Sequence, residues 1–151
     1  MKPTKLFLFL AVAVLLGACT RANKVIEFPL VGASNTTSIV FEKVELTDTA
    51  TMLTVRGFSR PNNWIKVSSY THLVAQGIEY RLLGSKDVEI DEELYMPEDG
   101  DSLLVLHFEP LPLSTKKFDL SEGTERGDWN IYGIDLTGKS SSPYKRGLPK
   151  S

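Results

Sequence analysis

Cysteine and histidine are scarce in this 151-residue sequence. Cys19 is the only cysteine, and His72 and His107 are the only histidines. A single cysteine excludes a disulfide within the chain and any Cys-x-x-Cys metal or redox site. Neither histidine has a second ligand type at the spacing of a metal site, and no Gly-x-Ser-x-Gly elbow is present. The sequence therefore predicts no metal, no cofactor and no catalytic residues.

Positive charge is scarce in the central part of the chain. The formal net charge is −2 at pH 7, and it becomes −4 without residues 1–18, which hold Lys2 and Lys5 and no acid. Residues 137–151 hold four more basic residues and no acid, so residues 19–136 carry a net charge of −8. Nucleic-acid affinity depends on clustered Lys and Arg opposite phosphates. We therefore exclude nucleic acid as a partner.

Residues 1–18 have the order of a secretory signal peptide. Lys2 and Lys5 precede an unbroken apolar run over residues 6–16, and two small residues follow it. Eleven apolar residues are too few to cross a hydrocarbon core, which needs about 20 residues in a helix. We expect the chain to be exported and residues 1–18 to be removed.

The four residues Leu16-Gly17-Ala18-Cys19 resemble a bacterial lipobox. In signals of that class the cysteine is lipidated on sulfur and becomes the first residue of the mature chain. The resemblance implies that Cys19 carries palmitate-type acyl chains, each buried CH₂ of which contributes about 0.8 kcal/mol of membrane affinity. The membrane is then a partner through the lipid anchor, residues 19–24 are the lipidated cysteine and a spacer, and no free thiol remains.

Sustained helical periodicity is absent, and alternating apolar and polar residues run through residues 25–136 instead. Turn signals recur about every eight to twelve residues, which is typical of an antiparallel immunoglobulin-like β-sandwich. The paired cysteines of true immunoglobulin domains are missing, so the likeness is one of architecture, and an open or closed barrel fits the same pattern. The expected strands are 25–28, 39–46, 51–58, 64–67, 72–74, 80–83, 88–90, 93–96, 103–108, 118–120 and 129–136.

Some strands carry more detailed predictions. The apolar phase shifts near Glu42-Lys43, which indicates a β-bulge, and Leu53 and Val55 are expected to face the core. Residues 103–108 (LLVLHF) are almost continuously apolar, as in a central strand that is covered on both sides or well buried. Residues 137–151 have the composition of a flexible tail or a truncated linker.

Five segments carry a family resemblance: 44–51 (VELTDTAT), 64–66 (WIK), 95–97 (YMP), 100–102 (GDS) and 129–134 (WNIYGI). They resemble an uncharacterised lipoprotein domain common in gut anaerobes of the Bacteroides group. That domain often precedes a thioredoxin-like thiol-disulfide oxidoreductase domain. This sequence contains no Cys-x-x-Cys, and Gly147-Leu148-Pro149 looks like the start of the linker to the missing domain. The resemblance implies a stand-alone or shortened accessory module.

Two charged motifs have a structural interpretation. Asp87, Glu89, Asp91 and Glu93 alternate along a stretch expected to be extended, and we interpret them as a solvated strand face, because calcium loops need a curved backbone. The tripeptide Arg126-Gly127-Asp128 is interpreted as a turn before the last strand rather than as an adhesion signal.

Aromatic and hydroxyl side chains supply the candidate sites. Trp64 is expected in the core, whereas Trp129 and Tyr132 form a possible ligand face that could stack on sugar rings. Asp48-Thr49-Ala50 and Asp101-Ser102-Leu103 resemble the O-glycan acceptor of exported proteins in the Bacteroides group. Thr49 and Ser102 are therefore the candidate acceptors.

The sequence thus predicts a non-catalytic, lipid-anchored envelope lipoprotein that serves as a binding or accessory module for another envelope protein, with the thiol-disulfide class as a candidate partner. Thr20 and Arg21 follow the cysteine without an acidic cluster, which favours the outer membrane, facing the periplasm, over display on the cell surface. The alternatives are a carbohydrate-binding module with exposed aromatics, the truncated N-terminal part of a thiol-disulfide oxidoreductase, and an enzyme whose site is assembled from distant strands. A pocket lined by His107 and a carboxylate would favour the last.

Overall fold

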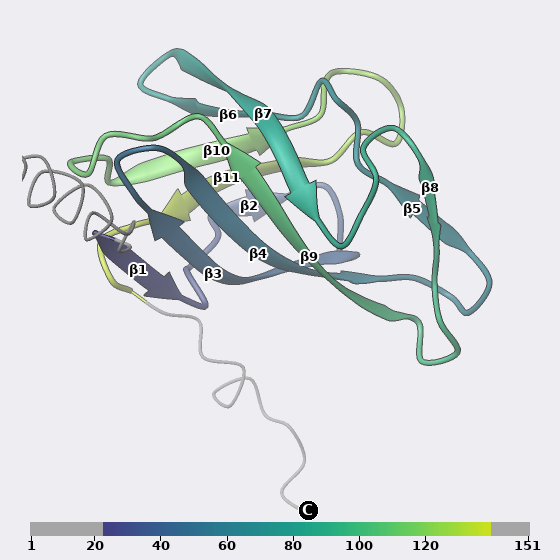
Figure 1. Cartoon of the computed structure of the whole chain (residues 1–151). Helices are drawn as coiled ribbons and strands as arrows, with labels where there is room; N and C mark the ends of the chain where they lie inside the picture. Colours follow the sequence, from purple (N-terminus) through teal and green to yellow (C-terminus); the bar gives the residue numbers. More distant parts are fainter. Residues whose placement is uncertain (1–22, 140–151) are drawn as a thin grey trace, which may run out of the picture.

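The computed structural model of the chain describes residues 23–139 (Figure 1). This part contains only strands, turns and loops, and paired strands run antiparallel throughout. The predicted all-β, antiparallel fold class is confirmed. No helix in residues 23–139 has the length and apolar character needed to cross a membrane. The predicted signal peptide, Cys19 and the tail from residue 140 lie outside the described residues.

Eleven strands form within residues 23–139. They are β1 (Lys24–Glu27), β2 (Ala33–Ser34), β3 (Ile39–Leu46), β4 (Thr51–Phe58), β5 (Trp64–Lys66), β6 (His72–Ala75), β7 (Ile78–Lys86), β8 (Glu93–Tyr95), β9 (Asp101–Phe108), β10 (Lys117–Ser121) and β11 (Asn130–Asp135). Nine of them form one sheet in the order β1-β3-β4-β9-β7-β6-β10-β11-β2, and β5 pairs with β8 in a separate ribbon.

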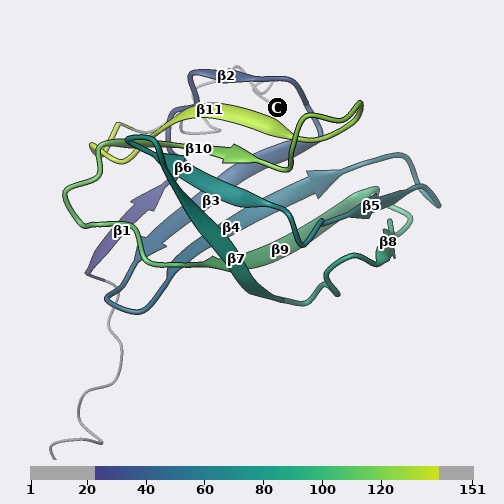
Figure 2. The same ribbon diagram turned by 90° about the horizontal axis from the view of Figure 1, so that it is seen from above.

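Strand β7 belongs to both halves of the large sheet. Its first residues pair with β6 and its last residues pair with β9, and the register shifts between Leu82 and Gly84. A bulge of this kind bends a strand and increases its twist. The sheet therefore curls at β7, so that β6, β10 and β11 lie over β3, β4 and β9 (Figure 2).

The inward faces of the two halves share one apolar core. Complete burial of a Leu, Ile, Val or Phe side chain contributes about 1.5–3 kcal/mol to folding. The fully buried side chains include Val44, Leu53, Leu104 and Phe108 from one half and Leu73, Phe118, Leu120 and Ile134 from the other.

The predicted bulge in β3 is confirmed, because the pairing of β3 with β4 shifts register between Phe41 and Lys43. This extra residue lets Phe41 and Val44 both face the core although their spacing breaks strict alternation. Leu53 and Val55 of β4 are buried as predicted. The bulge therefore keeps the apolar residues of β3 in phase with those of β4.

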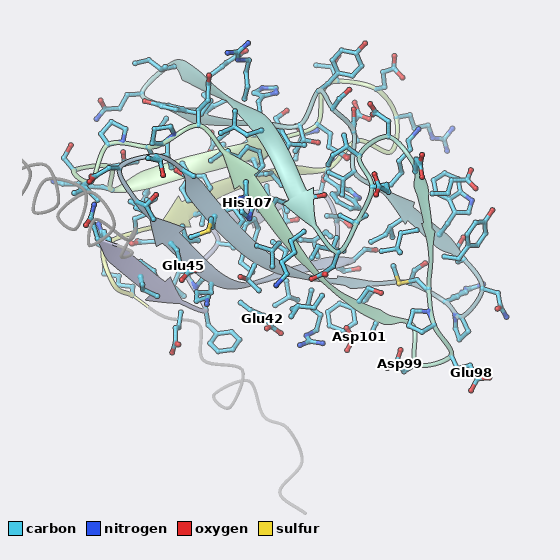
Figure 3. The ribbon with its side chains drawn as sticks, in the orientation of Figure 1. Glu42, Glu45, Glu98, Asp99, Asp101 and His107 are labelled. Carbon is cyan, nitrogen blue, oxygen red and sulfur yellow. The ribbon has the colours of Figure 1, made fainter. Side chains whose placement is uncertain are left out.

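Strand β9 is central, between β4 and β7, but it is not covered on both faces. Leu104, Leu106 and Phe108 are buried, whereas Leu103 is exposed and His107 is half-buried on the opposite face. His107 thus lies on the outward face of the strand (Figure 3). An antiparallel sheet can leave one face to solvent even where both faces carry apolar residues.

Two sequence predictions in the irregular regions are wrong. Residues 88–90 do not form a strand, because Asp87 and Asp91 adopt left-handed backbone conformations with φ of 70° and 64° and the segment between them turns. The acidic residues at 87, 89, 91 and 93 therefore do not share one face of a strand. The structure also contains the short edge strand β2 (Ala33–Ser34), which was not among the expected strands and which pairs with β11.

Candidate functional site

The described part of the chain begins at one end of the fold, and an open groove lies at the other. At the first end, here called the proximal end, the Asn23 N–H donates to the carbonyl of Leu46 at 2.8 Å. At the opposite end β4 stops, and β6, β9 and β11 begin. An eight-residue strand spans about 26 Å. Figure 1 shows the start of β1 at the left and the β5–β8 ribbon at the right.

A groove of about 1000 Å³ lies at this far end, here called the groove end. Residues 63–70, which include β5, form one wall, and the loop between β10 and β11 (residues 122–129) forms the other. Phe58, the last residue of β4, also lines the groove. The site is thus built from segments that are distant in the sequence.

Exposed aromatic side chains gather at the groove end. Trp64 is 44% exposed and Tyr70 is 80% exposed, and both line the groove together with Phe58. Tyr95 of β8, which is 60% exposed, pairs directly with Trp64 across the ribbon, so both side chains lie on the same face of it. Of the five exposed aromatics in the described residues, only Tyr132 lies elsewhere, on β11.

The prediction that Trp64 lies in the core is wrong. Strand β5 has only three residues, and its central residue Ile65 is the one buried against the core, with Leu94 half-buried opposite it. Successive side chains of a strand point to opposite faces, so Trp64 and Lys66 point outward. A strand this short contains too little alternation for the sequence to show which face is buried.

The structure separates Trp129 from Tyr132. Trp129 is half-buried, packs against the core and lines the groove. Tyr132, three residues later, is exposed on β11, while Ile131 between them is buried. The odd spacing places the two aromatics on opposite faces of an extended chain. Trp129 thus shares the groove with Trp64 and Tyr70, and Tyr132 does not.

Glu122 connects the two walls of the groove. Its largely buried carboxylate accepts the backbone N–H of Trp129 at 2.9 Å and that of Ser68 at 3.4 Å. Desolvation raises the pKa of Glu122 above its ordinary value, although these two hydrogen bonds act in the opposite direction. The sequence places Glu122 only before a turn, and its contact with Ser68, 54 residues away, has no local signal.

Two further carboxylates stabilise the loops around the groove. Asp91 accepts the backbone N–H of Ser69 at 2.8 Å, and this hydrogen bond lowers the pKa of Asp91. Asp128 accepts the N–H of Glu125 at 2.8 Å, while its own N–H donates to the Glu125 carbonyl at 3.2 Å. Residues 125–128 therefore form a closed turn, and the predicted turn at the Arg-Gly-Asp tripeptide is confirmed.

The groove carries more negative than positive charge. Its carboxylates outnumber its cationic side chains by five to two. Lys66 lowers the pKa of both Asp91 and Glu122, so this cation lies within electrostatic reach of two of them. The carboxylates are those of Glu79, Asp91, Glu122, Glu125 and Asp128, and the cations are those of Lys66 and Arg126.

The other polar clusters do not form comparable sites. Arg56 donates from Nη1 to both carboxylate oxygens of Asp101 at 3.0 Å and from Nε to Glu42, which makes an ion network across β3, β4 and β9. Figure 3 shows His107 well apart from Asp101 along β9. His107 lies outside the groove, and residues 23–139 contain no cluster of three His, Cys, Asp or Glu side chains suited to a metal ion.

The two candidate O-glycan acceptors lie in different environments. Thr49 is exposed in the turn between β3 and β4. Ser102 is half-buried as the second residue of β9, where it pairs with Gly57 of β4. Of the two, Thr49 therefore has the more accessible hydroxyl.

Comparison with known proteins identifies no relative: no protein-family model matches the chain, and no curated protein or solved structure is significantly similar to it.

Proposed function

We propose that this chain is a non-catalytic, lipid-anchored binding module of the bacterial cell envelope, and that the groove is its binding site. The observation that carries the proposal is the position of the groove, which combines exposed Trp64 and Tyr70 with fixed carboxylates at the end remote from Asn23. Large exposed aromatics gathered at one place are typical of interaction sites.

The proposed anchor and the groove are compatible in space. Acylated Cys19 would stand four residues before Asn23, and four extended residues reach at most about 14 Å. The proximal end then stays close to the membrane, and the groove, about 26 Å further along the strands, faces away from it. We propose the periplasmic side of the outer membrane as the location, with residues 25–136 as the binding domain.

The curled sheet also supports a finer proposal on fold class. Its two halves, centred on β4 and β10, correspond to the two layers of an immunoglobulin-like β-sandwich, with β7 shared between them.

The partner that we propose is another envelope component, with a protein of the thiol-disulfide class as the first candidate. In such a pair the redox chemistry would belong to the partner, since Cys19 is the only cysteine.

The binding proposal is tested by crosslinking the full chain in its native envelope and recovering what is attached. Wild type is compared with Trp64→Ala and Tyr70→Ala, and Tyr132→Ala serves as the control, since Tyr132 is 49% exposed but lies away from the groove. We expect the groove variants to lose the crosslinked partner and the control to keep it. Equal recovery from all four proteins, or none above background, contradicts the proposal.

The anchor is tested separately with Cys19→Ser. We expect this variant to lose labelling by radioactive palmitate and to leave the membrane fraction. Because the substitution lies outside the described fold, the groove should be unchanged. Palmitate labelling that persists in Cys19→Ser contradicts the lipid anchor at this residue without affecting the binding proposal.

A further inference from the structure

We infer that the groove binds a neutral carbohydrate. This inference rests on the proposed binding function, and it takes a carbohydrate of the envelope, in place of a protein, as the ligand of the groove. The groove has a volume of about 1000 Å³, the upper part of the range for small-ligand sites. Three properties lead to this ligand class: the exposure of the aromatic rings, the state of the carboxylates and the distribution of charge.

The aromatic rings provide stacking surfaces in a groove that polar groups also line. Trp64 and Tyr70 expose large rings that line the groove, and Trp129 adds a half-buried ring from the opposite wall. Ser68 and Asp91 line the same groove. A sugar ring has apolar C–H faces that stack on an aromatic ring and hydroxyl edges that need hydrogen-bond partners. A wholly apolar ligand would instead leave these polar groups desolvated and without hydrogen-bond partners, which opposes its binding.

The carboxylates are positioned to accept hydroxyl hydrogen bonds. An ionised carboxylate has about four acceptor positions, and the N–H of Ser69 occupies one on Asp91. Exposed Asp91 therefore keeps acceptor positions that face solvent in the groove. Hydrogen bonds to an ionised carboxylate are about twice as strong as neutral ones. Because a backbone donor already orients Asp91, binding a hydroxyl requires little further ordering.

The charge distribution favours a neutral ligand over a charged one. Five carboxylates against two cations disfavour phosphate, sulfate or an acidic sugar. A cationic peptide would fit the negative excess and the aromatic rings. However, Lys66 acts on both Asp91 and Glu122, and Arg126 is exposed on the opposite wall. These cations offset part of the negative charge where a ligand would lie, and they repel a cationic ligand.

The test uses the full chain in detergent and the fluorescence of its two tryptophans, both of which line the groove. The probes are hexasaccharides of glucose, mannose, xylose and N-acetylglucosamine, with hexalysine and a heparin hexasaccharide as the charged probes. We expect at least one neutral hexasaccharide to change the fluorescence saturably and to bind at least tenfold more tightly than either charged probe. The result is confirmed by calorimetric titration, which does not depend on tryptophan.

Variants locate the binding. Trp64→Ala and Tyr70→Ala should each weaken binding at least tenfold, Trp64→Phe should restore most of it, and Tyr132→Ala should change it less than twofold. Thermal unfolding of each variant shows whether the fold is intact. The inference is overturned if no neutral probe binds, if hexalysine binds more tightly, or if Trp64→Ala binds like wild type.

The outcomes also separate this inference from the proposed function. If neutral hexasaccharides fail while Trp64→Ala still abolishes crosslinking in the envelope, the carbohydrate class is wrong and the binding module stands. If crosslinking is also insensitive to Trp64→Ala, both proposals fail.

Discussion

The proximal end and the groove end of the fold satisfy their polar groups in different ways. At the proximal end the Thr47 hydroxyl accepts the backbone N–H groups of Thr49 and Ala50 and donates to the Ala50 carbonyl, all within three residues. At the groove end the Glu122 carboxylate accepts N–H groups from Trp129 and from Ser68, which is 54 residues away in the chain.

This difference agrees with the proposal that the groove end is the binding region. The proximal turn is closed by its own residues, and Asn23 adds one contact by donating to Asp48 at 2.8 Å. The groove end uses the charged side chain of Glu122 to join two segments, and its exposed rings are left uncovered. A site that must stay open yet ordered needs such long-range support.

The largest expected effect on stability comes from Leu53→Ala. This substitution removes a fully buried side chain of β4, a strand that runs from the proximal end to the groove end. Creating a cavity of this kind costs about 2–5 kcal/mol. Urea unfolding followed by tryptophan fluorescence reports the groove end, and far-UV circular dichroism reports the whole sheet. We expect both probes to shift together, because one core supports both ends; two separate transitions would show that the ends unfold independently.

Glu122→Ala and Thr47→Ala compare the two ends directly. Loss of Glu122 leaves two backbone N–H groups without their acceptor, which costs about 1–3 kcal/mol. Loss of Thr47 should cost less, about 0.5–1.5 kcal/mol, because the turn that it closes reaches solvent at Thr49. Denaturant midpoints give both values, and amide hydrogen exchange at Ser68 and Trp129 should accelerate in Glu122→Ala alone. Unchanged exchange there contradicts the bridging role of Glu122.

The pH dependence of stability sharpens the comparison, since Glu122 has a raised pKa at the groove end. A carboxyl whose pKa is higher in the folded state binds more protons there than in the unfolded chain. Its stabilising contribution is complete below the ordinary value of 4.5 and is lost as the pH rises through the raised pKa. Asp91 and Asp135 have lowered pKa values, so their contributions are present above 3.8 and are lost as the pH falls through the lowered values.

We therefore expect Glu122→Gln to differ from wild type in its free energy of unfolding and in how steeply that free energy changes with pH. As the pH rises above the ordinary value of 4.5 and through the raised pKa of Glu122, the free energy of unfolding of wild type decreases, and the variant lacks this decrease. Urea midpoints measured across that range provide the comparison. Parallel curves for the two proteins would contradict a raised pKa for Glu122.

The smallest effect on stability is expected for Thr49→Ala in the exposed proximal turn. Surface substitutions of this kind change stability by about 0.5 kcal/mol or less. If Thr49 carries the proposed O-glycan, intact-mass spectrometry of protein from the native host should show the loss of one glycan in this variant. Ser102→Ala, which alters a half-buried position in β9, should leave the mass of that glycan in place.

The predictions made from sequence succeeded where the signal was local or repeated. The bulge at Glu42-Lys43 follows from one break in a long alternation, and the burial of Leu53 and Val55 follows from the alternation itself. They failed where the segment was short or strained. Trp64 lies in a three-residue strand, and the left-handed conformations of Asp87 and Asp91 convert an alternating sequence into a turn.

The sequence by itself determined an acidic, all-β chain with one cysteine, because period-two alternation and turn residues act over a few neighbouring positions. Only the tertiary structure decided that Trp64, Tyr70 and Trp129 line one groove and that Glu122 joins its walls. These relations depend on how the sheet curls at β7 and where its loops meet. Such contacts join residues far apart in the chain, so no local pattern encodes them.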